Sequence, residues 1–492
     1  MSTLPVDIYS VAAVREIDRT AIEDRGIPGY TLMTRAGAAA VSEARSTFPD
    51  AKRWQVVCGA GNNAGDGYVV ARLAAQEGVT VSVVAVVDPE SLQGDAAKAY
   101  NDFAAEGGVV AAWAGQLDPE ADLIIDGMLG SGLERDVEGE FALAVSAINS
   151  HNASVVALDI PTGIHGDTGN VMAFAVRADL TMTFVGLKAG LFLGDGPDYC
   201  GRVAFADLGV PPQCRHACEA AFRRIDDDHM RRTLAPRRRA SHKGDFGHVL
   251  VVGGGPGMPG AVRLCGEAAL RAGAGLVSLA THPDHASMIV ASRPELMSHG
   301  IESAEQLEPL LDKADVVAFG PGLGSGDWAA EVYDRLSNDS HPAVWDADAL
   351  NWLAAAPQAV DGRIITPHPG EAARMLDSDT VAVQADRSTS LRELRERFGG
   401  VAVLKGSGTL VSSTSGAAWL CTAGNPGMAA PGMGDVLTGV IAALLAQGLE
   451  PEDAAAVGVV AHAQAGDRAA VLGERGLMAS DLLAELRQIL NP

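Results

Sequence analysis

The segment Trp54-Gln-Val-Val-Cys58-Gly59-Ala-Gly61-Asn62-Asn63-Ala64-Gly65-Asp66-Gly67 decides how the first part of this chain folds. Its opening run, Trp54–Cys58, is short and mostly apolar, which is typical of a buried strand. The glycine-rich stretch that follows ends the strand. Tyr68–Glu77 then carries apolar residues at helical spacing. The segment therefore predicts a strand, a turn and a helix in succession.

The same alternation continues through the first half of the chain. We expect further strands at Val79–Val87, Asp122–Asp126, Val155–Asp159 and Leu180–Val185, with Phe141–Ile148 among the helices between them. Apolar strands that alternate with helices indicate a parallel sheet covered on both faces. Ligands of such sheets bind beyond the carboxyl ends of the strands.

The second half repeats the alternation with different sequences. Strands are expected at Val249–Gly253, Gly275–Ala280, Asp315–Phe319, Ala343–Asp346, Arg363–Thr366 and Val401–Lys405, and the C-terminal residues are expected to be helical. A charged segment without periodicity separates the halves. We therefore expect domains at residues 1–225 and 241–492, joined by a linker at 226–240.

Composition narrows the classes of protein that this chain can belong to. Its 492 residues are 47% hydrophobic, which excludes a disordered chain, and its net charge of −25 is spread over both halves. That charge disfavours nucleic acid and anionic membranes as partners, but it leaves small anionic ligands open because local backbone N–H groups can bind them.

The opening Met1–Asp7 lacks the pattern of a signal peptide, and no apolar run is long enough to span a membrane. The six cysteines show no disulfide framework, so reduced thiols in a cytoplasmic protein are expected. Cys214-Arg-His216-Ala-Cys218 could instead be a partial zinc site, although it lacks the paired spacing of a structural finger.

Gly59–Ala64 fits the loose dinucleotide pattern G-x-G-x-x-G/A, and Asp88 ends the next strand at about the expected distance. A nicotinamide-dependent oxidoreductase is therefore one hypothesis. Against it, two amides and a carboxylate in Asn62–Asp66 crowd a turn where a pyrophosphate usually meets bare backbone N–H groups. These side chains are either turn formers or oxygen ligands suited to a cation.

Two more polar turns follow strands of the same sheet. Asp126 opens a glycine-rich turn through Gly130 and Gly132, and Asp159 opens the turn Asp159-Ile-Pro-Thr162-Gly. A doubly wound sheet brings such turns to one edge, so they favour one site there over three unrelated structural turns.

These motifs together resemble the NAD(P)H-hydrate epimerase family, as do Ile27-Pro28, Leu32–Gly37 and Val185–Leu191. The resemblance implies a Rossmann-like three-layer αβα domain, a potassium ion and Asp159 as the catalytic carboxylate. Ala64 and Thr162 depart conservatively from the family's Gly and Ser. The implied potassium ligands are Asn63, Asp126 and Thr162, and the implied substrate contacts are Asn62, Asn63, Ala64, Gly65, Asp66, Gly130, Ser131, Gly132, Leu133, Glu134, Arg135, Asp136 and Asp159.

In the second half, Gly432-Met-Gly434-Asp435 opens the expected helix Val436–Gln447. A glycine run at a helix start presents free N–H groups and the positive end of the helix dipole to an anion. An aspartate at that point can accept a proton from an attacking hydroxyl group. The structural alternative is that Asp435 only caps the helix.

Gly320–Gly324, Trp345–Leu350, Thr366–Glu371 and Lys405–Thr409 complete a set that resembles the ribokinase-like fold. The phrases T-P-H-P-G-E, D-A-D-A-L and N-P-G-M-A resemble its NAD(P)H-hydrate dehydratase branch. Pro431 departs from the family pattern and removes one N–H group. The implied substrate contacts are Ala261, Gly322, His368 and Asp435, and the implied nucleotide contacts are Lys405, Gly406, Ser407, Gly408, Thr409 and Gly434.

The two resemblances imply a bifunctional enzyme with two α/β domains. It would epimerise the R and S hydrates of NADH and NADPH (NADHX and NADPHX) and dehydrate the S form with ADP or ATP and magnesium, as a homo-oligomer. A small-molecule kinase fused to a binding module, an oxidoreductase and a non-enzymatic nucleotide-binding scaffold remain alternatives.

Overall fold

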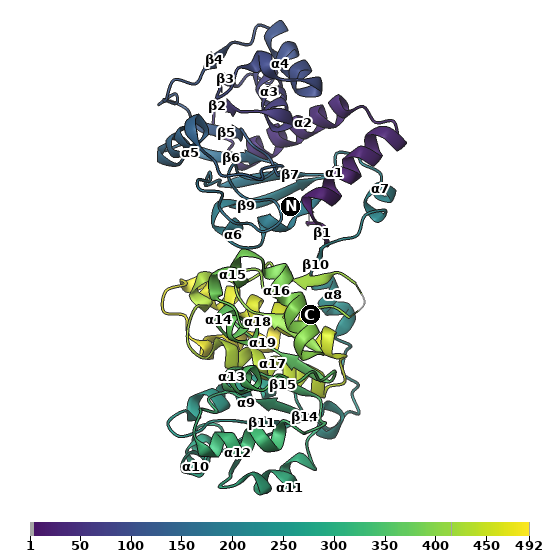
Figure 1. The fold of residues 1–492 in the computed structure, drawn as a ribbon, viewed down its shortest axis with the longest axis vertical. Coiled ribbons are helices and arrows are strands. Elements are labelled where there is room, and N and C mark those ends of the chain that lie inside the picture. Colours follow the sequence, from purple (N-terminus) through teal and green to yellow (C-terminus); the bar gives the residue numbers. More distant parts are fainter. Residues whose placement is uncertain (1–3, 415, 492) are drawn as a thin grey trace. The chain divides into compact units, whose positions relative to one another are not determined.

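The computed structural model describes residues 4–414 and 416–491, which form two compact units at residues 1–223 and 224–492 (Figure 1). Of the segment Met1–Asp7, which was expected to contain no signal peptide, residues 1–3 lie outside the described part. The segment 226–240 contains a helix, α8 (Asp227–Thr233), whose Met230 is buried.

The first unit contains a seven-stranded sheet in which every strand is parallel to its neighbours, in the order β4-β3-β2-β5-β6-β7-β9. The small strand β1 (Asp7–Tyr9) pairs with β8 (Leu187–Lys188) and β10 (Phe222–Arg224). The bounds of the sheet strands are β2 (Arg53–Cys58), β3 (Thr80–Ala85), β4 (Val110–Ala112), β5 (Leu123–Gly127), β6 (Ser154–Leu158), β7 (Leu180–Phe184) and β9 (Arg202–Ala206). The helices are α1 (Val11–Arg19), α2 (Gly29–Thr47), α3 (Gly61–Gln76), α4 (Gly94–Ala105), α5 (Gly139–Ser150), α6 (Gly196–Tyr199) and α7 (Pro212–His216).

Alternating side chains of β2 build the two faces of this sheet. Trp54, Val56 and Cys58 pack into the apolar core beneath α2, α3 and α4, whereas Val57 faces the core beneath α5. This alternation follows from the two-residue repeat of a strand. The expected three-layer αβα architecture is confirmed.

One expectation about the decisive segment is wrong. Asn62–Asp66 is not a loop, because α3 already begins at Gly61. At least one glycine of this segment lets α3 pack closely on the sheet. A Cβ on Gly67 would lie 2.9 Å from the Cys58 Sγ.

The second unit contains parallel strands in the order β13-β12-β11-β14-β15-β16-β17, extended by antiparallel β18 and β19. The strands are β11 (His248–Val252), β12 (Leu276–Thr281), β13 (Met297–Gly300), β14 (Val316–Phe319), β15 (Ala343–Trp345), β16 (Arg363–Ile365), β17 (Val401–Leu404), β18 (Leu410–Val411) and β19 (Ala418–Leu420). The helices after α8 are α9 (Pro259–Arg271), α10 (Pro283–Ser292), α11 (Glu308–Leu311), α12 (Asp327–Leu336), α13 (Asp348–Ala355), α14 (Pro369–Met375), α15 (Thr380–Ala385), α16 (Arg387–Phe398), α17 (Met433–Ala446), α18 (Pro451–Ala469) and α19 (Ala479–Ile489).

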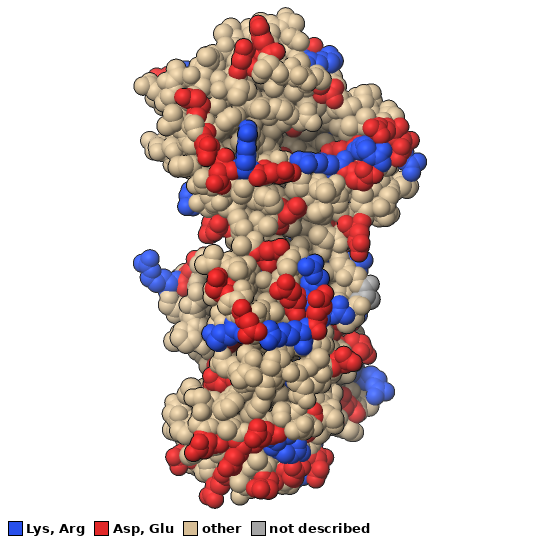
Figure 2. Space-filling model, viewed as in Figure 1, with Lys and Arg blue, Asp and Glu red and all other residues tan. Residues whose placement is uncertain are grey.

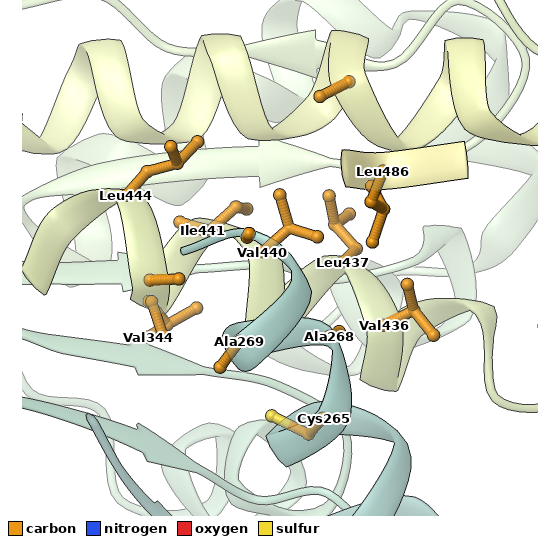
Figure 3. Close-up of a cluster of buried hydrophobic side chains, with 14 of the residues drawn as sticks. Cys265, Ala268, Ala269, Val344, Val436, Leu437, Val440, Ile441, Leu444 and Leu486 are labelled. Atoms are coloured by element: carbon orange, nitrogen blue, oxygen red, sulfur yellow. The ribbon is translucent and has the colours of Figure 1, made fainter. Parts of the chain in front are cut away.

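Helix α17 lies at the centre of the second unit. Figure 3 shows Val440 and Ile441 of α17 near α9 residues such as Ala268 and near Val344 of β15. The opposite face of the sheet is covered by an aromatic group, in which Phe319 and Trp345 contact Tyr333 of α12. The second unit is therefore also a three-layer αβα fold.

The surface agrees with the acidic composition. On the face drawn in Figure 2, basic side chains lie among acidic ones without forming a continuous basic patch. Within the described residues, no helix combines the length and apolar character that a membrane crossing needs. All six cysteines are free thiols, and Cys214, His216 and Cys218 form no cluster suited to a metal ion in the described part of the chain.

The packing of α17 on α9 predicts a steric effect at Gly439. A Cβ there would lie 2.1 Å from the carbonyl oxygen of Cys265, so Gly439→Ala must move a backbone. We expect the free energy of unfolding to fall by about 1–3 kcal/mol. Gly260→Ala in α9 is the matched control, because a Cβ at Gly260 meets no atom within 4 Å. Urea unfolding measures both, and equal stabilities would contradict the packing described.

Candidate active sites

Asp159 lies directly after β6 in a left-handed backbone conformation, with φ of 67°. A non-glycine residue in this region costs about 1–3 kcal/mol and persists only where its surroundings hold it. Its Oδ1 accepts a hydrogen bond from the Lys188 Nζ, and its Oδ2 accepts one from the Ser131 backbone N–H at 3.1 Å. Both carboxylate oxygens are therefore fixed.

Lys188 is a buried cation at the end of β8, with 1% of its side chain exposed. Its ammonium group also donates to the Thr183 Oγ1 at 3.1 Å and to the Phe184 carbonyl oxygen at 2.9 Å. Burial raises the pKa of Asp159, but the charge and hydrogen bonds of Lys188 and Ser131 outweigh it and lower the pKa overall. Asp159 is thus ionised at neutral pH.

Two further carboxyl groups surround this ion pair, Asp66 on α3 and Asp18 on α1. Burial and the negative charges of Asp159 and Asp18 raise the pKa of Asp66 well above its usual value. Burial also raises the pKa of Asp18 to about 6, with a smaller contribution from Asp159. The site therefore combines an ionised carboxylate with protonatable ones, an arrangement suited to acid and base chemistry.

The expected potassium ligands also gather at this edge. The buried Asp126 accepts hydrogen bonds from the Thr162 backbone N–H at 2.8 Å and from the Thr162 Oγ1 at 2.7 Å. Burial raises the pKa of Asp126 to about 6. Asn63 is 6% exposed, and neither its Oδ1 nor its Nδ2 has a partner in the described part of the chain. Oxygen donors of this kind fit a hard monovalent cation.

The expected substrate contacts of the first unit differ in their placement. Ala64 and Leu133 have their side chains in the apolar cores, so only their backbones can face a ligand. Glu134–Asp136 is exposed. Gly130 lies against the Asp159 carboxylate, since a Cβ there would be 3.4 Å from the Asp159 Oδ2.

The second site forms where α17 begins. Gly432 is the N-cap residue, so Asp435 is the third residue of the helix and does not cap it. The backbone N–H groups of Met433, Gly434 and Asp435 have no partner inside the helix, as in any first helical turn. Pro431 precedes the cap, so its missing N–H group is not one of these. The expected anion-binding turn is thus retained.

A buried ion pair lies beneath this turn. The Lys405 Nζ is 2.6 Å from the Asp346 Oδ1 and 3.8 Å from the Glu371 Oε2. Burial lowers the pKa of Lys405, but the negative charges of Asp346 and Glu371 raise it overall. Burial raises the pKa of Asp346, but Lys405 and Thr438 lower it overall. Both partners are therefore charged.

The pKa of Asp435 is raised to about 7, first by burial and then by the negative charge of Asp346. Lys405 opposes this shift and Asp348 adds to it. A carboxylate with a pKa near 7 is matched to accepting and releasing a proton at neutral pH. This environment is consistent with a general base.

Arg387 holds the expected nucleotide loop, which runs from Lys405 to Thr409. Its buried Nη2 donates to the carbonyl oxygens of Leu404 at 3.1 Å and of Lys405 and Gly408 at 3.3 Å. Burial lowers the pKa of Arg387 to about 10. The Thr409 hydroxyl closes the loop by donating to the Gly406 carbonyl oxygen at 2.8 Å.

The remaining expected substrate contacts surround the same strand ends. His368 caps α14: its Nδ1 accepts from the Gly370 N–H at 3.0 Å, and its Nε2 lies 3.5 Å from the Glu371 Oε1. A Cβ on Gly322 would lie 3.0 Å from that of Ala261. The Asp348 carboxylate accepts from the Gly324 N–H at 2.8 Å and so holds this turn.

Several residues of the two sites were not expected from the sequence to have a role there. Lys188 and Asp346 stand in motifs that resemble the families, and each follows or ends a strand, which was the available signal. Asp18 and Arg387 lie in ordinary helices. Nothing in their sequence context distinguishes them from exposed charged residues.

Two αβα units, each with a polar site at the carboxyl edge of a parallel sheet, define a two-domain α/β enzyme. Residues 29–190 match the family model of YjeF-related protein N-termini, and residues 249–488 match that of NAD(P)H-hydrate dehydratases.

Known proteins resemble the whole chain as well as its second unit. The bifunctional NAD(P)H-hydrate repair enzyme Nnr of Coxiella burnetii is 44% identical over 99% of both chains. The enzyme of the same name from Escherichia coli is 43% identical over all of this chain and 95% of its own. A solved ribokinase-like superfamily protein of Enterococcus faecalis is 27% identical, covering 55% of this chain and 96% of its own, with a TM-score of 0.52.

The chain belongs to the family of bifunctional NAD(P)H-hydrate repair enzymes, with an epimerase domain followed by a dehydratase domain. The Rossmann-like and ribokinase-like folds expected from the sequence are confirmed. The kinase, oxidoreductase and scaffold alternatives are not favoured.

The Lys188–Asp159 pair predicts a pH-dependent stability defect in Lys188→Met. In the native chain the lowered pKa of Asp159 stabilises the fold above the unfolded pKa, and this stabilisation is lost as the pH falls through the folded pKa. Without Lys188 the buried carboxylate has a raised pKa, so its ionisation destabilises the variant as the pH rises.

We expect a loss of about 3–5 kcal/mol at pH 7. Urea unfolding should give a smaller loss at about pH 4, near the unfolded pKa of aspartate. The double variant Lys188→Met/Asp159→Asn should recover part of the loss, because it leaves no buried unpaired charge. An equal loss at both pH values would contradict the account.

Proposed function

We propose that the first unit epimerises the R and S hydrates of NADH and NADPH and that the second dehydrates the S form with ADP, giving AMP and phosphate. The observation that carries the proposal is the pair of carboxylates with contrasting environments, Asp159 ionised by Lys188 and Asp435 poised near neutral pH. The domain boundaries proposed from the sequence fit this division of labour.

In the epimerase site, Asp159 is the catalytic carboxylate. Exchange between the hydrates needs reversible proton transfer near the hydroxyl-bearing carbon of the ring. An ionised carboxylate whose oxygens are both held is a positioned base for that transfer. Asp159 lies close enough to Asp66 for its negative charge to raise the pKa of Asp66, which belongs to the proposed substrate contacts.

In the dehydratase site, Asp435 takes the proton of the hydrate hydroxyl as its oxygen attacks the β-phosphorus of ADP. AMP leaves, the ring nitrogen lone pair then expels phosphate, and loss of a ring proton restores the reduced nicotinamide. The N–H groups of Gly434 and its neighbours stabilise the developing phosphate charge. Magnesium bound to the nucleotide would supply further charge neutralisation.

The proposed division of labour predicts separable defects. Asp435→Asn should abolish ADP-dependent recovery of reduced-nicotinamide absorbance and leave R/S exchange intact, because it alters only the second unit. Asp159→Asn should reduce exchange toward the uncatalysed rate and leave dehydration of the S hydrate intact. Chiral chromatography of the hydrates and absorbance measure the two activities. Wild-type exchange in Asp159→Asn, or dehydration in Asp435→Asn, would contradict the assignment.

We also propose that Asn63, Asp126 and Thr162 hold potassium in the first unit. The two unpartnered polar atoms of the buried Asn63 support this proposal, since such groups are costly without a ligand. Asn63→Leu keeps the branched shape of the side chain and removes the oxygen.

We expect the native chain to melt at a higher temperature in potassium chloride than in N-methylglucamine chloride of equal ionic strength, because a bound ion stabilises the folded state. Asn63→Leu should lose this difference. The exposed Asn152→Ala serves as a control in the same unit and should keep it. A native chain with no potassium-dependent shift would contradict the site.

A further inference from the structure

Asp346 is a buried carboxylate to which the proposed reaction assigns no part. It follows β15 and is 1% exposed. Its Oδ1 accepts from the Lys405 Nζ at 2.6 Å, and its Oδ2 accepts from the Thr438 Oγ1 at 2.8 Å. Three parts of the chain, at the ends of β15 and β17 and within α17, therefore meet at one side chain.

The contact with Thr438 ties Asp346 to the first turns of α17. Thr438 lies three residues after Asp435, and residues at this spacing share one face of a helix. The face of α17 that carries Asp435 is thus fixed to the end of β15 by a fully buried hydrogen bond. A change at Asp346 would release both the helix and Lys405.

The backbone of the anion-binding turn rests on the same pair. A Cβ on Gly434 would lie 3.2 Å from the Asp346 Oδ2 and 3.3 Å from the Lys405 Nζ. Both distances are tighter than about nine in ten real Cβ contacts, so a side chain at Gly434 would press on the pair. The ion pair and the turn therefore form one closely packed structure.

We propose that Asp346, together with Lys405, is a positioning pair that sets the orientation and the proton affinity of Asp435. The pair acts through Asp435 and the turn at Gly434, and no contact of Asp346 with substrate is required. This inference rests on the proposed role of Asp435 as the base of the dehydratase.

The charges around Asp435 support a tuning role. Asp346 and Asp348 both raise the pKa of Asp435, and Lys405 lowers it. Because Asp346 holds Lys405 in an ion pair, it also limits how far that cation can ionise Asp435. A net pKa of about 7 results from this opposition together with burial.

Other titratable groups that face this region do not replace the pair. On α9, burial raises the pKa of the Cys265 thiol well above its usual value, so the thiol is neutral. On α18, burial lowers the pKa of His462 to about 4, so its imidazole is neutral at pH 7. At the start of α14, the negative charge of Glu371 raises the pKa of Lys405. Burial lowers the pKa of His368, and the negative charge of Asp346 opposes that shift.

The test is the pH dependence of kcat for dehydration by the full chain at saturating ADP. Asp346→Asn removes a negative charge and frees Lys405 to act on Asp435, so the acidic limb of the profile should move to lower pH by about one unit or more. The maximal kcat should fall several-fold, because Asp435 becomes a weaker base. Lys405→Met should move the limb in the opposite direction.

The exposed Asp361→Asn, also in the second unit, changes the net charge equally and should leave the profile unmoved. A direct readout is the titration of the Asp435 carboxyl by ¹³C NMR in the nucleotide-free chain, assigned with Asp435→Asn. Its midpoint should fall in Asp346→Asn and rise in Lys405→Met.

A uniform loss of kcat without movement of the limb or of the titration midpoint would overturn the inference, and so would movement in the same direction in both variants. If the native chain dehydrates no hydrate, the proposed function fails. The NMR midpoints would still decide whether the pair tunes Asp435.

Discussion

The buried lysine–aspartate ion pair at the carboxyl edge of each sheet is the interaction on which both sites depend. Lys188 pairs with Asp159 in the first unit, and Lys405 pairs with Asp346 in the second. Removing two charges from water is costly, and the pairing offsets that cost only with well-placed hydrogen bonds. Both pairs have such bonds: Ser131 donates to Asp159 and Thr183 accepts from Lys188 in one unit, and Thr438 donates to Asp346 in the other.

The two units use the pair differently. In the first unit the paired aspartate is the proposed catalytic group, and the protonatable carboxyls of Asp66 and Asp18 lie around it. In the second unit the paired aspartate is not the proposed catalyst, but its negative charge raises the pKa of the proposed catalyst Asp435. Each site thus combines an ionised carboxylate with a protonatable one, which is how one protein environment supports proton transfer in both directions. The net charge of −25 is compatible with acidic dinucleotide substrates because local backbone N–H groups, such as those at the start of α17, can bind an anion.

Much of the fold could be predicted from the sequence, because buried strands such as Trp54–Cys58 and the valines of β11 carry a continuous apolar signal. The start of α3 could not, since Gly61–Gly67 contains three glycines, a residue type that usually marks a turn, and close helix–sheet packing overrides that local preference. The edge of the sheet at which each site lies could also be predicted, because the polar turns follow the carboxyl ends of strands. The lysine partner of each aspartate could not be predicted. Lys188 and Lys405 lie 29 and 59 residues from their aspartates, and only the folded chain brings them together.

Two sites, each organised by its own ion pair, are thus proposed to carry out successive steps on one substrate pool. The most direct measurement is the conversion of pure R hydrate to reduced nicotinamide in the presence of ADP. With Asp159→Asn alone, the R hydrate should be converted to NADH only as fast as it exchanges spontaneously to the S form. With Asp435→Asn alone, no NADH should form. An equimolar mixture of the two variants should convert all of the R hydrate. Failure of the mixture to exceed the separate chains, with both variants folded, would contradict the account.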